Sequence, residues 1–459
     1  MPALSKYKTY PEYKDSDIVL FGKIPRHWNL LRYKNILSIF QGMAFKSNSY
    51  VDNSNVLNIR MGNIKKGGNI DLSHNIKYLP NDYKNIFKEY RLYSGDIIIA
   101  MTDMSPSLDF LAVPAVLEGL DKGKTYLLNQ RVGKLIIAKS FNLSFIKYSL
   151  LDDSLKHQLK IKGLGTVQSN MSSEDLYSSY LSIPSIQEQT KIAQFLDHET
   201  AKIDQLIEKQ QTLIELLKEK RQAVISHAVT KGLDPNVKMK DSGVEWLGKV
   251  PEHWEVTKFP YEVFFQEGPG ILAPDFHDDG IPLLRIQNIK TDYVSNDFKN
   301  FLDPKKVKDK WQHFSVGLGD LIISGSASTD LISEVDASTI GSIPYTGLIR
   351  LKPKSKRISK DYIKAFVQSN LFKDQIKTLQ TGSTIQHFGP IHLQQIRMSA
   401  PPIDEQNIII SFLTNQTSKI DLLIQKAEQQ IELMKERRTA LISAAVTGKI
   451  DVRDWQPEQ

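Results

Sequence analysis

Two Arg-x-x-Asn patterns contain residue types that are well suited to reading DNA bases. Arg60 and Asn63 form the first pattern, and Arg285 and Asn288 form the second, each near the end of a predicted strand. Arginine and asparagine side chains make paired hydrogen bonds with the exposed edges of guanine and adenine. The patterns therefore predict DNA contacts. An equally weighted alternative is that each is a polar pair supporting the next loop.

Two further pairs of predicted loops carry small polar residues. Residues 101–104, with Thr102, correspond to residues 325–328, with Ser326 and Ser328. Small hydroxyl residues suit close backbone approach to phosphate or base, although such a loop is more often an ordinary turn. Before each of the long helices considered below, a Gly-[polar]-Thr-[Val/Ile]-Gln sequence recurs within 163–176 and 381–393. These two loops are candidate DNA contacts or, equally, structural corners.

The candidate DNA-binding residues share polar side chains in or beside these predicted loops. They are Lys46, Arg60, Asn63, Thr102, Gln130, Arg131, Thr166, Gln168, Arg285, Asn288, Ser326, Ser328, Thr384 and Gln386. No catalytic residue is predicted, because Walker, Gly-x-Ser-x-Gly and Asn-Pro-Pro-Tyr-type motifs are all missing. No metal site is predicted either, since His27 and His253 have no ligand partner at metal-binding spacing. Trp28 and Trp254 beside them are interpreted as packing residues.

Composition places the chain among ordinary globular proteins. Its 459 residues suffice for two to four domains, and the net charge of +7 makes an acidic partner plausible. The chain has no cysteine, which excludes disulfides and thiolate metal sites. No apolar run approaches the roughly 18 residues of a membrane span, so we expect a cytoplasmic protein with no membrane partner.

A long duplicated segment organises the chain. Residues 186–230 and 403–447 are identical at 25 of 45 positions. Apolar residues in both copies follow a heptad pattern, which predicts two long helices with a coiled-coil seam. Ser185 with Glu188 predicts a capped start of the first helix, and Gly232 and Gly448 predict where the two helices end. Gln210 interrupts the first seam and Ala427 the second, each near its middle, which favours an antiparallel pair that brings the two opposite each other. The alternative is that each helix packs separately on a globular core.

The repeat extends beyond the helices. Residues 15–30 match residues 241–256, including a shared Pro-x-His-Trp sequence. Between this signature and the helix, each half contains short Ile/Val/Leu-rich segments that predict strands: 56–64, 95–101 and 133–140 in the first half, and 282–289, 319–326 and 345–352 in the second. A segment with helical spacing follows in each half, at 145–160 and 361–377. We predict an α+β protein with two similar domains joined by the helix pair with pseudo-two-fold symmetry. The expected boundaries are 1–184, 185–232 (first helix), 233–401 (connector and second domain) and 402–459 (second helix and tail).

Several of these sequences together resemble one protein family. The segment DSGVEWLGKVPEHW, the two Gly-Thr-containing corners and the twice-occurring Pro-x-x-x-Glu-Gln start of a Lys-Ile-Asp helix are similar to the specificity subunit of Type I restriction-modification systems. The similarity covers essentially the whole chain. The first signature departs mildly from the pattern at 17–21, where the second copy has Gly243 to Leu247.

The resemblance implies a function and a set of partners. It implies two target recognition domains, each reading one half of a split sequence in double-stranded DNA, and helices that set the spacing and bind two methyltransferase subunits. Such subunits have no catalysis of their own. S-adenosylmethionine is used by the methyltransferase partners for adenine N6 methylation, and ATP and Mg²⁺ by the restriction and translocase partners.

The helix-pair and methyltransferase interface is assigned to the seam positions. These are Leu196, Ile203, Gln210, Leu217, Leu413, Ile420, Ala427 and Met434. The charged outer faces at 218–221 and 435–438 are either solvated or part of a methyltransferase-binding surface. Two other functions stay open from the residues alone: a coiled-coil protein adaptor without DNA specificity, and a self-contained DNA-modifying enzyme with an unrecognised site.

Overall fold

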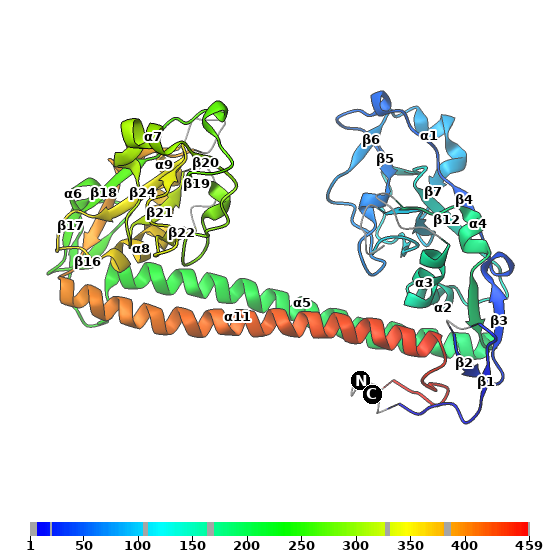
Figure 1. Cartoon of the computed structure of the whole chain (residues 1–459). Coiled ribbons are helices and arrows are strands. Elements are labelled where there is room, and N and C mark those ends of the chain that lie inside the picture. The colour runs from blue at the N-terminus through cyan, green and yellow to red at the C-terminus, as the bar shows by residue number, and fades with distance from the viewer. Residues whose placement is uncertain are drawn as a thin grey trace. The chain divides into compact units, whose positions relative to one another are not determined.

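The computed structural model describes residues 7–18, 21–103, 109–162, 169–325, 331–380 and 387–457. These residues form two compact units (Figure 1). Unit 1 comprises Met1–Lys209 and Gln430–Gln459, and unit 2 comprises Gln210–Gln429. The two long helices, α5 (Ile186–Lys231) and α11 (Ile403–Val446), each contribute one part to each unit. The fold is α+β with two long helices, as predicted.

The ends of α5 follow from its sequence. The Ser185 hydroxyl accepts a hydrogen bond from the backbone N–H of Glu188, which satisfies a donor that the first helical turn leaves free. At the other end, Gly232 has a φ of +76°, a conformation that favours glycine. Gly448 has a φ of +72° just after α11. Both predicted stops are confirmed.

In each unit the α5 and α11 segments lie side by side (Figure 1). In unit 1, Arg438 of α11 pairs with Asp204 of α5, and in unit 2, Arg221 of α5 pairs with Asp421 of α11. The α5 residue number rises between these two pairs while the α11 number falls. The predicted antiparallel pairing is therefore confirmed.

Unit 1 contains two four-stranded sheets and three two-stranded pairings. Across the first sheet the order is β10 (Pro114–Val116), β8 (Ile97–Ala100), β12 (Val132–Ile137) and β4 (Leu37–Gln41). Across the second it is β6 (Lys77–Leu79), β5 (Val56–Ile59), β11 (Thr125–Leu128) and β7 (Arg91–Leu92). The pairings are β1 (Tyr13–Asp15) with β2 (Lys23–Pro25), β3 (Asn29–Arg32) with β14 (Tyr180–Ile183), and β9 (Thr102–Asp103) with β13 (Ser169–Asn170).

Unit 2 repeats this plan. Its four-stranded sheet has the order β18 (Val263–Glu267), β24 (Leu348–Pro353), β21 (Leu321–Ser324) and β22 (Ile332–Glu334). Its second sheet has the order β20 (Phe301–Leu302), β19 (Ile281–Leu284) and β23 (Ile343–Pro344). Two further pairings are β15 (Met239–Asp241) with β16 (Lys249–Pro251), and β17 (Glu255–Lys258) with β25 (Arg397–Ala400). The two units are thus similar in topology, as expected from the repeat.

Each segment predicted to be helical is divided into two helices. In unit 1 these are α2 (Leu143–Leu150) and α3 (Asp153–Ile161), and in unit 2 they are α8 (Lys360–Gln368) and α9 (Asn370–Leu379). The second helix of each pair starts at a side-chain cap, Asp152 or Ser369. Because such side chains satisfy the N–H groups of a new helix, they mark a start inside the apolar pattern.

One glutamine in each unit fixes the last strand before the long helix. The Gln158 side chain of α3 accepts a hydrogen bond from the backbone N–H of Tyr180 and donates one to its carbonyl. Gln375 of α9 makes the same two bonds with Arg397. Among the described residues, no helix is long and apolar enough to cross a membrane.

Candidate nucleic-acid interface

Asn63 and Asn288 have their amide groups occupied within the protein. Each side-chain oxygen accepts a hydrogen bond from the backbone N–H of the preceding arginine, Arg60 or Arg285, over 3.0 and 2.9 Å. The amide nitrogens donate to backbone carbonyls of the following loop, for example Asp71 over 3.0 Å. Both asparagines are buried, at 3% and 1% exposure. This geometry matches the alternative interpretation, a polar pair that supports the next loop, and replaces the predicted single strand over 56–64 by a short strand and a turn.

The two arginine side chains are held differently. The Arg285 guanidinium lies over the rings of Phe276 and Tyr345, with its central carbon 5.3 and 4.6 Å from the ring centroids. In unit 1, Arg60 donates a hydrogen bond from Nη2 to the carbonyl of Asn75 over 2.9 Å. Contact with aromatic faces fixes the plane of a guanidinium while leaving most of its N–H donors unused. Arg285 is therefore an oriented cation suited to a phosphate or base edge.

Three predicted contact residues in unit 1 come together at one end of the sheets. Met43 and Asn129 form a bridge, and the backbone N–H of Gln130 donates to the Met43 carbonyl. This brings the loop that carries Lys46 close to Gln130 and Arg131, and all three of these side chains are exposed.

A glycine makes this approach possible. A Cβ atom on Gly42 would lie 2.1 Å from the Asn129 carbonyl oxygen, and one on Gly268 would lie 2.1 Å from that of Pro344. Only glycine fits at either position. The same close approach is therefore built into both units, although the side chains at matching positions differ: Asn129 and Gln130 in unit 1 correspond to Tyr345 and Thr346 in unit 2.

Thr102 is not accessible. It is 6% exposed, lies in β9 and has its hydroxyl 3.2 Å from the Met61 sulfur. The predicted contact through this side chain is therefore corrected: the Thr102 hydroxyl is buried against Met61. Six other predicted residues lie outside the described part of the chain, namely Thr166, Gln168, Ser326, Ser328, Thr384 and Gln386.

The two predicted loops of each unit begin and end next to each other. In unit 1, Thr102 pairs with Asn170 and Asp103 with Ser169, so the residues before one loop lie beside those after the other. In unit 2, the backbone N–H of Phe388 donates a hydrogen bond to the Gly325 carbonyl over 2.8 Å, which joins the corresponding loop ends. A Cβ atom on Gly325 would be 2.1 Å from the Phe388 carbonyl oxygen, which again requires glycine. Both units thus bring together the residues that flank two segments about 60 residues apart in the sequence.

Unit 2 also presents a basic segment that the sequence analysis did not single out. The short helix α7 (Pro304–Lys306) and the π-helix that follows it expose the side chains of Lys305, Lys308 and Lys310. Lys306 pairs instead with Asp275, and this hydrogen bond holds the pKa of the Asp275 carboxyl below its ordinary value. Alternating lysines on a surface turn are suited to phosphate contacts. The lysine-rich sequence KKVKDK at 305–310 could have indicated this basic segment.

In each unit, the histidine and tryptophan of the Pro-x-His-Trp sequence contact a glutamate from the first turn of a long helix. In unit 1, the Glu188 carboxylate accepts hydrogen bonds from Trp28 Nε1 over 3.0 Å and from the Tyr10 hydroxyl over 2.7 Å. His27 Nε2 lies 2.8 Å from its other oxygen. The pKa of the Tyr10 hydroxyl lies above its ordinary value, mainly because the group is buried and secondly because it donates a hydrogen bond to Glu188.

Unit 2 contains the same arrangement of side chains. Glu405 accepts a hydrogen bond from Trp254 Nε1 over 3.0 Å, and His253 Nε2 lies 2.7 Å from the same carboxylate. Trp28 and Trp254 are fully buried, in agreement with the packing interpretation. The carboxylate partner was missed because it lies more than 150 residues away in the sequence. The recurrence of a glutamate at the matching positions Glu188 and Glu405 could have indicated this partner.

Most of the predicted seam residues are buried. Those with at most 8% exposure are Leu196, Ile203, Leu217, Leu413, Ile420 and Ala427, and those that are half-buried are Gln210 and Met434. Six other leucines of the helices are exposed, and two of them, Leu213 and Leu422 at 43% and 50%, have glutamines as their repeat counterparts. Leu206 and Leu433 of unit 1 are 46% and 56% exposed, and Leu216 and Leu423 of unit 2 are 56% and 50% exposed. They form two repeat-related pairs, Leu206 with Leu423 and Leu216 with Leu433, so both copies leave the same positions uncovered.

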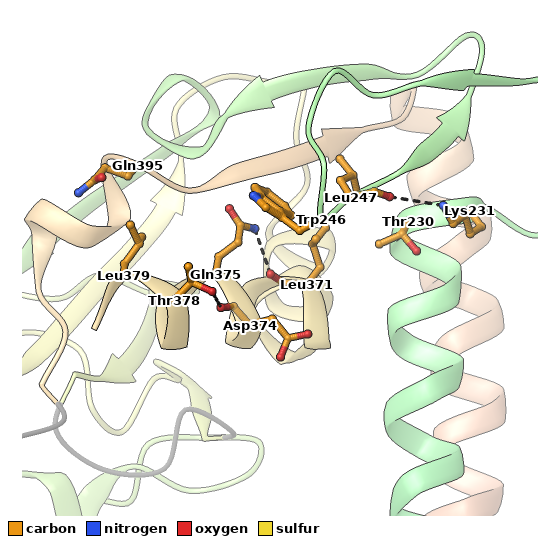
Figure 2. A pocket seen from close by; sticks show the side chains of 10 residues that line it. All are labelled: Thr230, Lys231, Trp246, Leu247, Leu371, Asp374, Gln375, Thr378, Leu379 and Gln395. Atoms are coloured by element: carbon orange, nitrogen blue, oxygen red, sulfur yellow. Dashed lines mark hydrogen bonds between the residues drawn. The ribbon is translucent and has the colours of Figure 1, made fainter. Parts of the chain in front are cut away.

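A pocket of about 370 Å³ in unit 2 lies beside the end of α5 (Figure 2). Leu371, Leu379 and the half-exposed Trp246 give it apolar walls. Its lysine, Lys231, donates to the carbonyls of Leu247 and Lys249, and burial lowers the pKa of its ammonium. The described residues contain no cluster of three or more His, Asp or Glu side chains arranged to hold a metal ion.

Comparisons with known proteins place this geometry in context. The family model described as the Type I restriction modification DNA specificity domain matches residues 25–216 and 262–433, more than half of the chain. The chain is 22% identical over 462 residues to the putative type I restriction enzyme MjaX specificity subunit of Methanocaldococcus jannaschii, covering 99% of this chain and 100% of that protein. It is 24% identical to the MjaVIII specificity subunit of the same organism, covering 68% of this chain and 70% of that protein.

A solved structure has the same fold. A chain from a study of complex assembly and conformational transition of the type I R-M system superimposes with a TM-score of 0.65 at 13% identity, covering 92% of this chain and 98% of that one. At this identity the likeness concerns the fold alone. Together with the family match, these findings do not favour the adaptor or self-contained enzyme alternatives.

Proposed function

Because the chain belongs to the Type I restriction modification DNA specificity family, we propose that its two globular regions each read one half of a split DNA sequence. The chain is a DNA sequence-recognition subunit of a Type I restriction-modification system, and a non-catalytic one. We further propose that the helices set the spacing between the two half-sites, and that the residues named below contact the DNA.

One observation supports the proposal that each unit reads one half-site. Both units build the same backbone frame from tight glycine contacts, at Gly42 and Gly268, and from paired loop ends. The side chains at matching positions of these frames differ: Asn129 and Gln130 in unit 1 correspond to Tyr345 and Thr346 in unit 2. The same frame with different side chains is the arrangement expected of two modules that dock in the same way on DNA and select different bases.

Affinity and selectivity would come from different side chains. Exposed cations such as Lys46, Lys308 and Lys310 would contact phosphates and supply most of the salt-dependent affinity. Arg285, oriented by two aromatic rings, would contact a phosphate or a base edge. Asn63 and Asn288 would act indirectly, by fixing the turn that follows each arginine.

The helix pair supports the proposed binding of two methyltransferase subunits. Leu206 and Leu433 in unit 1, and Leu216 and Leu423 in unit 2, are exposed apolar side chains at repeat-related positions. Exposed apolar residues that recur at matching positions are typical of partner-binding surfaces. We assign each pair to one methyltransferase subunit. In this proposal the exposed leucines make the main contact, in place of the buried seam positions to which the sequence analysis assigned it, and the charged faces at 218–221 and 435–438 stay either solvated or part of the same surface.

The partners would supply the chemistry. S-adenosylmethionine would be bound by the methyltransferase subunits, and ATP and Mg²⁺ by the restriction and translocase subunits, with none on this chain. Single-molecule sequencing of host DNA with and without the gene tests the function. The expected result is a split N6-methyladenine motif that disappears on deletion of the gene. An unchanged set of methylated motifs in a strain whose methyltransferase subunit is expressed would refute the proposal.

A further inference from the structure

Phe195 of α5 is covered by both ends of the chain. It is fully buried in unit 1, and two aromatic rings pack on it edge to face: Tyr7 from the N-terminal segment, with ring centroids 5.3 Å apart, and Trp455 from the C-terminal segment, at 5.4 Å. Trp455 also contacts the ring of His198 at 5.2 Å. The face of the helix at Phe195 is thus sealed by this chain's own aromatic residues.

The repeat-related face in unit 2 is open. Phe412, which lies 217 positions after Phe195, is 38% exposed, and Ile408 one turn earlier is 61% exposed. Within the described residues, no ring contact to Phe412 is formed. The connector that follows α5, residues 233–240, contains no aromatic residue that could take the place of Trp455.

This open face lies on the same side of α11 as the exposed Leu423, with the polar residues Asn415 and Lys419 between them. Successive residues of an α-helix are rotated by about 100°, so Ile408, Phe412 and Leu423 lie within about 60° of one another around α11. Leu423 is half-exposed and belongs to the surface assigned above to a methyltransferase subunit. A partner bound at Leu423 therefore meets Ile408 and Phe412 along the same stripe.

We propose that a segment of the methyltransferase subunit, carrying an aromatic side chain, covers Ile408 and Phe412 in unit 2. It takes the place that Tyr7 and Trp455 hold in unit 1, where the same phenylalanine position is sealed by edge-to-face aromatic contacts. Aromatic pairs of this kind contribute specific geometry as well as buried apolar area. The inference rests on the proposed function, since it names a surface within the proposed methyltransferase contact.

The two methyltransferase subunits then meet different chemistry in the two units. The subunit at unit 1 meets a face already closed by the chain's termini, while the subunit at unit 2 must supply the cover itself. Substitutions on the open face should therefore weaken one of the two subunits and leave the other unchanged.

The variant Ile408→Lys tests this directly, because lysine is the residue that the first copy has at this position, Lys191. The full-length chain is titrated with its methyltransferase subunit and the complexes are weighed by native mass spectrometry. The expected result is at least tenfold weaker binding of one methyltransferase subunit, so that a complex with a single such subunit accumulates. Phe412→Leu should give a smaller loss in the same direction, since it removes the ring but keeps an apolar contact.

A matched control is Leu318→Lys, which places the same charge at a residue of unit 2 that is 69% exposed and lies outside the helices. It should retain two methyltransferase subunits. Full retention of both subunits by Ile408→Lys would overturn the inference, as would loss of both. A wild-type chain that forms a dimer sensitive to Ile408→Lys would identify a second copy as the occupant and would also overturn it. A wild-type chain that binds no methyltransferase subunit would instead refute the proposed function.

Discussion

Arg438 donates a hydrogen bond from Nε to Oδ1 of Asp204 over 3.0 Å, linking α11 to α5 in unit 1. In unit 2 the same contact recurs with the helices exchanged, as Arg221 donates to Asp421 over 2.9 Å. Each residue of the second pair is the repeat counterpart of one in the first, 217 positions away. The helix pair therefore has an internal two-fold relationship that is visible in individual side chains.

Charge reversal at this contact tests the register of the helices. Asp204→Arg alone should lower the free energy of unfolding by up to about 1 kcal/mol, because partly exposed ion pairs contribute little and like charges repel. Adding Arg438→Asp should restore most of the loss, as measured by urea denaturation in a double-mutant cycle. Equal losses in the single and double variants would show that the two residues do not interact.

Removal of the Glu188 carboxylate should be much more costly. Glu188→Ala leaves the buried donors of Trp28 and Tyr10 without their acceptor, so we expect a loss of about 2 to 4 kcal/mol. Urea denaturation followed by tryptophan fluorescence measures the effect. The control Glu12→Ala removes a carboxylate that pairs with Arg26 on the surface and should cost less than about 1 kcal/mol. Similar losses of unfolding free energy in the two variants would refute a structural role for the hydrogen bonds of Glu188.

The C-terminal segment should become less stable in acid. Burial acts to raise the pKa of the Asp451 carboxyl, but hydrogen bonds from Arg453 outweigh it and hold this pKa below its ordinary value. A depressed folded-state pKa gives stability that is present above the unfolded value of about 3.9 and is lost as the pH falls through the folded value.

Fluorescence of Trp455 checks this prediction, with Trp455→Phe as the reference for the other four tryptophans. The signal should change below about pH 4, as the segment leaves Phe195 and His198. In Asp451→Asn the segment should be weakened already at neutral pH, and the acid transition should be smaller. An identical transition in Asp451→Asn would assign the change to another carboxyl.

The basic segment of unit 2 should contribute to affinity and not to sequence choice. Substituting glutamine at Lys305, Lys308 and Lys310 should weaken DNA binding and lower the slope of log affinity against log salt by up to about 3, since each phosphate contact contributes about 0.9. The methylated motif should stay the same. A changed second half-site would show that this segment reads bases.

The repeat and the helices were accessible from the sequence because their signals are periodic. The heptad pattern and the cap at Ser185 predicted a helix over 185–232, and α5 spans Ile186–Lys231. The strands were placed to within a few residues, but the segment 56–64 contains only β5, because Asn63 caps a turn that a local pattern of apolar residues does not show.

Contacts between distant segments were not accessible in the same way. Nothing local to His27 and Trp28 indicates that Glu188 is their partner, because the corner depends on tertiary folding. The same holds for Thr102, whose polar side chain suggested exposure although pairing with Asn170 buries it. Among the predicted site residues, Lys46, Gln130 and Arg131 are brought together, and only the folded chain shows why Gly42 permits it.

The most direct test of two readers joined by a fixed spacer is the methylated motif of a chain lengthened in its helix. Four residues inserted in α5 add about 6 Å of helical rise. The motif is read by single-molecule sequencing of DNA from cells that express the wild type or the lengthened chain with the same methyltransferase. We predict that both half-sites stay unchanged and that the gap between them changes by one or two base pairs. An active variant with an unaltered gap, or with altered half-sites, would contradict the account.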